Sequence, residues 1–176
     1  MISILGENYT IIEDGLNGRT VLNLSPVNKM ANGIECTNSV IETSLPLDIV
    51  IISLGLNDVF IGGEVTLQQI SDGVEEIIDI IRNSHISGGF KIPEFIIMAP
   101  PEFNTGIEGV QFFELQINKL KGLPEIYKHL SSKNNYHFFN TSDYVKGSIL
   151  DGSHLEPGSH VLLGEKMAEF ILSRIK

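Results

Sequence analysis

The sequence contains a single cysteine, Cys36, among its 176 residues. One thiol excludes a disulfide bond within the chain and a zinc site built from cysteines. Basic residues are also scarce: 12 Lys and Arg stand against 22 Asp and Glu, so the net charge is −10. Nucleic acids and anionic membrane surfaces are bound through Lys and Arg that replace counterions. We therefore expect neither nucleic acid nor a membrane as a partner.

Long apolar runs are missing as well. No stretch reaches the roughly 20 apolar residues that a membrane-spanning helix needs. The start, Met1 to Glu7, has no basic region and too short an apolar run for a signal peptide. These features predict a cytoplasmic protein. The length and a hydrophobic content of 42% predict one globular domain, residues 1–176.

Strand-like and helix-like patterns alternate along the chain. Near-continuous aliphatic runs are typical of strands covered on both faces, whereas apolar residues at helical spacing indicate helices. The predicted strands are residues 9–12, 48–54, 94–98 and 136–139. The predicted helices are residues 66–82, 111–130 with a break at 122–124, and 157–175. This alternation predicts an α/β fold: a flavodoxin-like, doubly wound parallel sheet with helices on both faces.

An acid and a histidine lie close together after the last predicted strand. Asp151 stands three positions before His154, on a loop that enters the last predicted helix. A carboxylate there can hold one imidazole nitrogen while the other nitrogen faces a cleft, as in the orienter and general base of nucleophilic hydrolases. One alternative is a surface Asp beside a helix-entry His. Another is a pair of metal ligands, although no further His or Cys cluster completes a metal shell.

Two more loops follow predicted strands and should meet this one at a common rim, because ligands in such folds bind beyond the carboxyl ends of the strands. Asn57, in Gly55-Leu56-Asn57-Asp58, offers uncharged N–H donors that can stabilise an oxyanion. Gly18 can present its backbone N–H to the same oxyanion. Both residues also fit ordinary turns, and Asp58 is expected to be a cap or loop anchor. Arg19 is expected to pair with a carboxylate inside the domain, with an acidic substrate as the alternative.

Three segments, in this order along the chain, resemble the second, third and fifth sequence blocks of the SGNH (GDSL-type) hydrolase superfamily. The second block is similar to that of the arylesterase-like branch. The resemblance covers nearly the whole chain from about Leu5 onward. The segments are Glu13-Asp14-Gly15-Leu16-Asn17-Gly18-Arg19-Thr20, Gly55-Leu56-Asn57-Asp58 and Asp151-Gly152-Ser153-His154.

The resemblance implies hydrolysis of a small acyl or aryl ester by a serine nucleophile, through an acyl-enzyme that water resolves. It implies His154 as general base and Asp151 as its orienter. It also implies that the Gly18 backbone N–H and the Asn57 side-chain N–H form the oxyanion hole. No metal or organic cofactor is implied. Residues 62–63 and 104–109 are expected at the mouth of the cleft, and the sequence is compatible with a monomer or a homo-oligomer.

The family's first block, a Gly-Asp-Ser stretch that carries the nucleophile at the end of the first strand, is absent from these residues. Residues 1–7 resemble the tail of the helix that follows that block, so we expect an SGNH-like domain that lacks its first strand and is N-terminally incomplete. No serine stands in a Gly-Asp-Ser setting. The serines weighed as replacements are Ser3, Ser25, Ser53, which is expected inside a buried strand, and Ser153.

Two functions stay open at this stage. The first is an esterase whose nucleophile strand lies outside the 176 residues, and the second is a non-catalytic SGNH-like binding or interaction protein that keeps the cleft without the serine. Loss of a central strand leaves buried backbone groups unpaired, which favours the first. Donation of a strand by a second chain is a further route. The remaining histidines are expected to be core or surface residues: His85, His129, His137 and His160.

Overall fold

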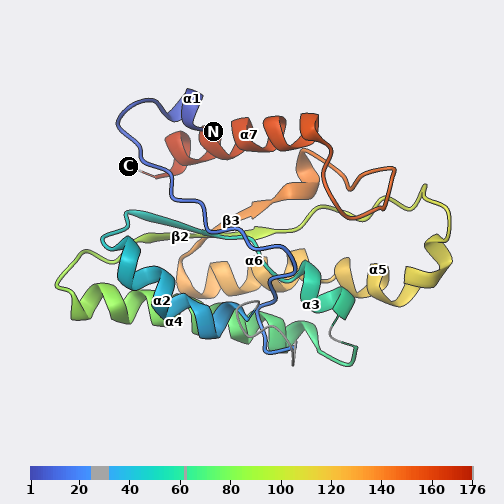
Figure 1. The fold of residues 1–176 in the computed structure, drawn as a ribbon, viewed down its shortest axis with the longest axis horizontal. Helices are drawn as coiled ribbons and strands as arrows, with labels where there is room; N and C mark the ends of the chain where they lie inside the picture. Colours follow the sequence, from blue (N-terminus) through green and yellow to red (C-terminus); the bar gives the residue numbers. More distant parts are fainter. Residues whose placement is uncertain (25–31, 62, 176) are drawn as a thin grey trace.

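A three-stranded parallel sheet forms the centre of the computed structural model, which describes residues 1–24, 32–61 and 63–175. Its strands are β1 (Ile49–Ile52), β2 (Glu94–Ala99) and β3 (His137–Asn140), in the spatial order β1-β2-β3 (Figure 1). Ile51 pairs with Ile96 in β2, and Met98 of β2 pairs with Phe139. β2 lies in the middle, and its side chains are mostly buried, as expected for an aliphatic run covered on both faces.

Helices cover both faces of the sheet (Figure 1). On one face lie α7 (Pro157–Arg174) and the short α1 (Ile2–Leu5). On the other lie α2 (Gly33–Ser44), α4 (Leu67–Ser87) and α6 (Leu123–Asn134). The shorter elements are α3 (Leu56–Ile61), η2 (Val110–Phe113), α5 (Glu114–Leu120) and η3 (Thr141–Asp143). The predicted α/β class, a parallel sheet between helical layers, is confirmed. Within the described residues, no helix combines the length and apolar character of a membrane span.

α4 shows how local sequence builds the helical layer. Thr66 and Gln69 form a capping box at its start, in which the Gln69 N–H donates to Thr66 Oγ1 and the Thr66 N–H donates to Gln69 Oε1. The predicted apolar stripe is buried along the helix: Ile70, Val74, Ile77, Ile78 and Ile81. The helix runs to Ser87, beyond the predicted end at residue 82, because buried His85 continues the stripe by one more turn.

The predicted break in the long helical segment is confirmed, since α5 ends at Leu120 and α6 begins at Leu123. Two helices were outside the sequence prediction. α2 begins after Asn32, whose Oδ1 accepts the N–H groups of Ile34 and Glu35. Its buried positions include the polar residue Thr37, so the apolar pattern that would predict this helix is weak. α3 begins inside the block that the sequence predicts as a loop.

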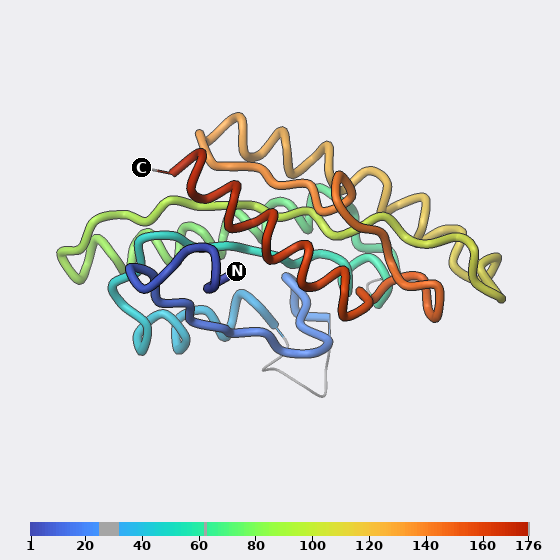
Figure 2. The backbone as a smooth tube through the Cα atoms, turned by 90° about the horizontal axis from the view of Figure 1, so that it is seen from above, coloured from blue at the N-terminus to red at the C-terminus, as the bar shows by residue number. Residues whose placement is uncertain are grey.

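The prediction of a strand at residues 9–12 is wrong. This segment is irregular, and in Figure 2 it passes along β1 on the side that faces away from β2. Tyr9 and Ile11 are partly buried against the core on the α7 face, but the segment has no strand pairing. Within the described residues β1 pairs with β2 alone, and it forms no ladder with this segment. The other edge of β1 is therefore open.

Candidate active site

Asp151 and His154 form a closed turn after β3. Asp151 Oδ2 lies 2.8 Å from His154 Nδ1, and Asp151 Oδ1 accepts the backbone N–H groups of Ser153 and His154 at 2.9 Å each. The His154 backbone N–H is the largest influence that lowers the pKa of Asp151, to about 2. The carboxylate is thus charged at neutral pH and fixes the imidazole through Nδ1. Within the described residues, no hydrogen bond reaches His154 Nε2, and the side chain is 76% exposed.

Gly152 makes this turn possible. Its φ of 81° lies in the left-handed region, and a Cβ at this position would approach the Phe103 ring to 2.3 Å. Its N–H donates to the Ser148 carbonyl at 2.9 Å, and its carbonyl accepts the Asn104 N–H at 2.8 Å. A residue other than glycine would open the turn that pairs the acid with the histidine.

Asn57 contacts Arg19, the residue that directly follows Gly18, although Asn57 and Arg19 are 38 positions apart in the sequence. Asn57 Nδ2 donates to the Arg19 carbonyl at 2.9 Å, and Arg19 directly follows Gly18. Gly18 has a φ of 76° in a turn closed by the Arg19 N–H on the Leu16 carbonyl. Within the described residues no atom lies within 4 Å of a Cβ placed on Gly18, so the positive φ, rather than crowding, favours glycine there. The structure thus brings Asn57 into contact with the residue that directly follows Gly18.

Asp58 connects α3 to the segment that follows Gly18. Its carboxylate is fully buried and accepts the N–H of Val21 at 2.9 and 3.0 Å and the N–H of Leu22 at 3.0 Å. Burial raises the pKa of Asp58, and the hydrogen bonds from Leu22 and Val21 oppose that rise. Asp58 holds the chain after Gly18 against α3, which is the anchor role that its position in the sequence predicts.

A pocket of about 160 Å³ lies at the carboxyl ends of β1 and β2. Asn57 and Arg19 line it, and Arg19 pairs with Asp14, so its expected pairing with a carboxylate of the domain is present. Ser53 also lines the pocket and is exposed. The prediction that Ser53 is buried inside a strand is wrong, because β1 ends at Ile52. The other lining residues are Leu54, Gly55, Leu56, Pro100 and Pro101.

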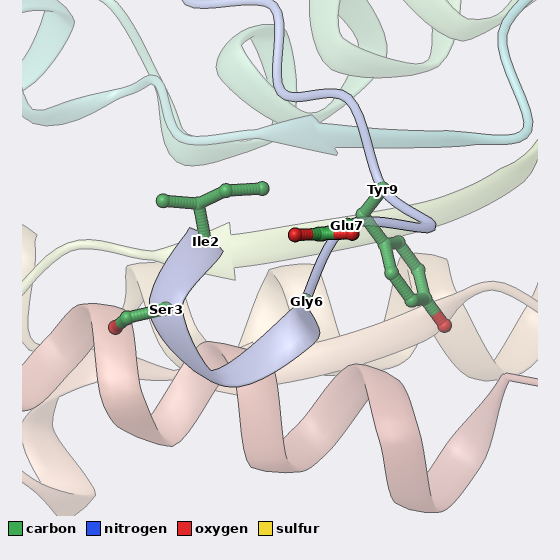
Figure 3. Close-up of a pocket in the computed structure, with 5 residues that line it drawn as sticks. All are labelled: Ile2, Ser3, Gly6, Glu7 and Tyr9. Carbon is green, nitrogen blue, oxygen red and sulfur yellow. The ribbon is translucent and has the colours of Figure 1, made fainter.

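A second pocket, of about 390 Å³, is formed by α1 and the segment after it (Figure 3). Ser3 and Tyr9, two of its lining residues, point in different directions in Figure 3. The five residues labelled there include no histidine, so none of them can serve Ser3 as the histidine base of a serine hydrolase. This hollow is separate from the predicted catalytic residues.

Ser153 does not have the geometry that a nucleophile needs. Ser153 Oγ lies 3.5 Å from His154 Nδ1, the nitrogen that Asp151 already occupies, so it is on the wrong side of the ring for Nε2 to take its proton. Ser25 lies outside the described residues, as does Gly62, which was expected at the cleft mouth. Asn104, also expected at the cleft mouth, bonds the loop that carries Gly152.

Two of the remaining histidines, His85 and His137, have partners within the fold. His85 is fully buried, with Nδ1 2.9 Å from the Ile81 carbonyl and Nε2 accepting the Leu47 N–H at 3.1 Å. His137 lies 3.4 Å from Glu94. In the part of the chain that the structure describes, no group of three or more His, Cys, Asp or Glu residues is arranged to hold a metal ion.

Esterases of known structure share this fold. The native aryl esterase of M. smegmatis is 28% identical to the chain, with a TM-score of 0.88 over 98% of this chain and 82% of that one. Est24, a carbohydrate acetylesterase from Sinorhizobium meliloti, is also 28% identical, with a TM-score of 0.88 over 98% and 82%. A lipase/acylhydrolase from Enterococcus faecalis is 20% identical, with a TM-score of 0.62 over 90% and 73%, which shows the fold alone. No protein-family model and no curated protein matches the chain.

The chain thus has the α/β fold of these esterases, a parallel sheet between helical layers. The predicted resemblance to the SGNH (GDSL-type) hydrolase superfamily agrees with this shared fold. The resemblance to its arylesterase-like branch, predicted from three short sequence blocks, is confirmed.

Proposed function

We propose that the chain is the acid, base and oxyanion part of a carboxylic-ester hydrolase that acts on small acyl or aryl esters. His154 is the general base, Asp151 orients it, and Gly18 and Asn57 stabilise the oxyanion. The observation that carries the proposal is the Asp151 Oδ2 to His154 Nδ1 distance of 2.8 Å, which leaves Nε2 available for a hydroxyl. The aryl esterase and carbohydrate acetylesterase that share the fold support this substrate class.

The reaction begins when His154 Nε2 removes the proton from a serine hydroxyl as the oxygen attacks the ester carbonyl. Asp151, whose pKa is lowered to about 2, stays ionised and stabilises the imidazolium. The oxyanion is stabilised by the Gly18 N–H and by the Asn57 N–H that is not bonded to the Arg19 carbonyl. His154 then returns the proton to the leaving alcohol, and water resolves the acyl-enzyme by the same steps.

The nucleophilic serine, in this proposal, comes from a segment outside the 176 residues. The open edge of β1 supports this, because its backbone groups can pair with one more strand. A parallel strand there would end beside the pocket that contains Asn57 and Gly55, where a Gly-Asp-Ser turn would present its hydroxyl. Asn57 lines this pocket, and so does Arg19, which directly follows Gly18.

The test is hydrolysis of p-nitrophenyl acetate by the chain alone and by the chain joined, before Met1, to a segment with a Gly-Asp-Ser strand. We call the second protein the completed protein. We expect turnover from the completed protein only, and loss of that turnover in His154→Ala and in a matched Gly-Asp-Ala control. A folded completed protein without turnover would overturn the hydrolase proposal. Turnover by the chain alone that His154→Ala removes would show instead that one of its own serines acts.

A non-catalytic binding protein is the second candidate. It is favoured by the exposure of His154, 76% at its side chain, and by the absence of a hydroxyl at Nε2 within the described residues. Such a protein would bind an ester or its carboxylic acid product in the pocket without turning it over. Binding of p-nitrophenyl acetate by the completed protein, without release of p-nitrophenol, would favour this candidate.

A further inference from the structure

The segment after β2 is bonded to the loop that carries the acid and the base. Gly147 N–H donates to the Glu102 carbonyl at 2.9 Å, Asn104 N–H donates to the Gly152 carbonyl at 2.8 Å, and Asn104 Nδ2 donates to the Gly147 carbonyl at 3.1 Å. Asn104 Oδ1 accepts the Gly106 N–H at 3.0 Å, which orients the amide so that Nδ2 faces Gly147. Asn104 thus bonds both ends of the loop, Gly147 and Gly152.

The two glycines of this loop pack directly against each other. A Cβ on Gly147 would lie 1.9 Å from the Gly152 carbonyl oxygen. Asn104 contacts the carbonyls of both glycines, so its two hydrogen bonds hold the loop closed at its narrowest point. The loop is a packed structure rather than a free surface segment.

Phe103 joins this loop to the helix of Asn57. Its ring is 4% exposed and lies under Gly152, where any Cβ would collide with it. The same ring stacks on Phe60 with centroids 5.7 Å apart and an interplanar angle of 25°. Phe60 follows Asn57 by three residues on α3, so both lie on neighbouring turns of one helix. Phe113 completes the cluster at 5.9 Å from Phe103 and 6.0 Å from Phe60.

We propose that Phe103 and Asn104 are positioning residues that set the placement of the Asp151–His154 turn relative to Asn57. Asn104 holds the turn closed by its hydrogen bonds to the carbonyls of Gly147 and Gly152. The Phe103 ring packs between that turn and Phe60 of α3 and so sets the distance between them. Neither side chain touches the reacting atoms. The importance of this arrangement for catalysis rests on the proposed hydrolase function, whereas the geometry itself can be tested without a substrate.

The first test follows the carboxyl of Asp151 by NMR during an acid titration of the chain as given. The variants are Asn104→Ala and Phe103→Leu, and the matched controls are Asn118→Ala and Phe112→Leu, which alter exposed residues. The pKa of Asp151 is about 2 because the turn aims backbone N–H groups at it. We expect it to rise toward the ordinary value of about 3.9 in both variants and to stay low in both controls. An unchanged pKa in two folded variants would overturn the inference.

The second test uses the completed protein and p-nitrophenyl acetate. Misplacing a catalytic group by about 1 Å can cost roughly 100-fold in rate, so we expect kcat to fall by about that factor with little change in KM. If Phe103→Leu fails to fold, Asn104→Ser decides, because it keeps the backbone bond to Gly152 and removes the Nδ2 donor, while the serine hydroxyl can still accept the Gly106 N–H. A raised pKa of Asp151 without turnover in any protein would support the positioning role and contradict the hydrolase proposal alone. A low pKa with normal kcat in Asn104→Ser would overturn the positioning role.

Discussion

Asp58 on α3 accepts two hydrogen bonds from the Val21 N–H, at 2.9 and 3.0 Å, inside the protein. This contact joins the block that contains Asn57 to the residue that directly follows the block of Gly18. Because Leu22 also donates to Asp58, the chain that follows Gly18 cannot move independently of α3. The relative placement of Gly18 and Asn57 therefore depends on a carboxylate that is itself remote from the chemistry.

Replacing Asp58 with alanine should destabilise the protein. The N–H groups of Val21 and Leu22 would lose their acceptor while buried or partly buried, at a cost of about 1–3 kcal/mol each. We expect the free energy of unfolding to fall by roughly 2–4 kcal/mol in urea denaturation. Asp72→Ala, at an exposed position, serves as control and should change it by no more than about 0.5 kcal/mol. Equal losses in both variants would show that the anchor is unimportant.

Asn57→Ala should affect catalysis more than stability. The hydrogen bond to the Arg19 carbonyl is partly buried and contributes about 1 kcal/mol to folding, whereas loss of an oxyanion donor lowers kcat by roughly 100- to 1000-fold. The measurement is p-nitrophenyl acetate turnover by the completed protein, beside urea unfolding. Asn17→Ala, exposed in the neighbouring loop, is the control. A kcat loss below tenfold would remove Asn57 from the oxyanion hole.

Gly152→Ala should open the turn at the base without unfolding the domain. The φ of 81° and the Phe103 ring both exclude a Cβ. We expect NMR spectra to show loss of the hydrogen bond between the His154 N–H and Asp151 and, in the completed protein, loss of turnover. Gly158→Ala, where nothing lies within 4 Å of the added Cβ, should keep both. An intact Asp151–His154 pair in Gly152→Ala would contradict the role of the glycine.

His85→Ala should reduce stability through packing and an orphaned donor. The ring is fully buried, and its removal leaves a cavity and takes the acceptor from the Leu47 N–H. We expect a loss of roughly 2–4 kcal/mol in the free energy of unfolding. His129→Ala, at an exposed position of α6, should be nearly neutral. Similar stability of the two variants would argue against a structural role for His85.

The Asp151 turn should depend on pH only in strongly acidic solution. The pKa of Asp151 is depressed in the folded state, so its stabilising contribution is complete above the ordinary value of about 3.9 and is lost as the pH falls through about 2. We expect the His154 backbone amide resonance to shift with a midpoint near pH 2. In Asp151→Asn this transition should be absent. A midpoint near pH 4 in the unmodified chain would mean that the turn does not hold the carboxylate.

Much of the site could be predicted because its signals are local. Asp151 and His154 are three residues apart, and one turn with a left-handed glycine is enough to pair them. Phe103 gave no such signal: it follows Pro100-Pro101 at the end of a strand, which marks it only as a loop residue near the rim. The prediction of a strand at residues 9–12 was wrong because a β-type pattern shows only a preference for extended backbone. It does not show whether another strand is placed to pair with the segment.

The sequence by itself determined the α/β class, most of the helices, the three strands of the sheet and the turn that pairs Asp151 with His154. Each of these follows from periodicity, capping or turn chemistry within about 20 residues. Only the tertiary structure decided that Asn57 meets Arg19, that Asp58 holds Val21, and that Phe103 lies between Phe60 and Gly152. Those contacts join parts of the chain that are far apart in the sequence. They form because the helices pack on the sheet in one particular arrangement, which no local sequence pattern encodes.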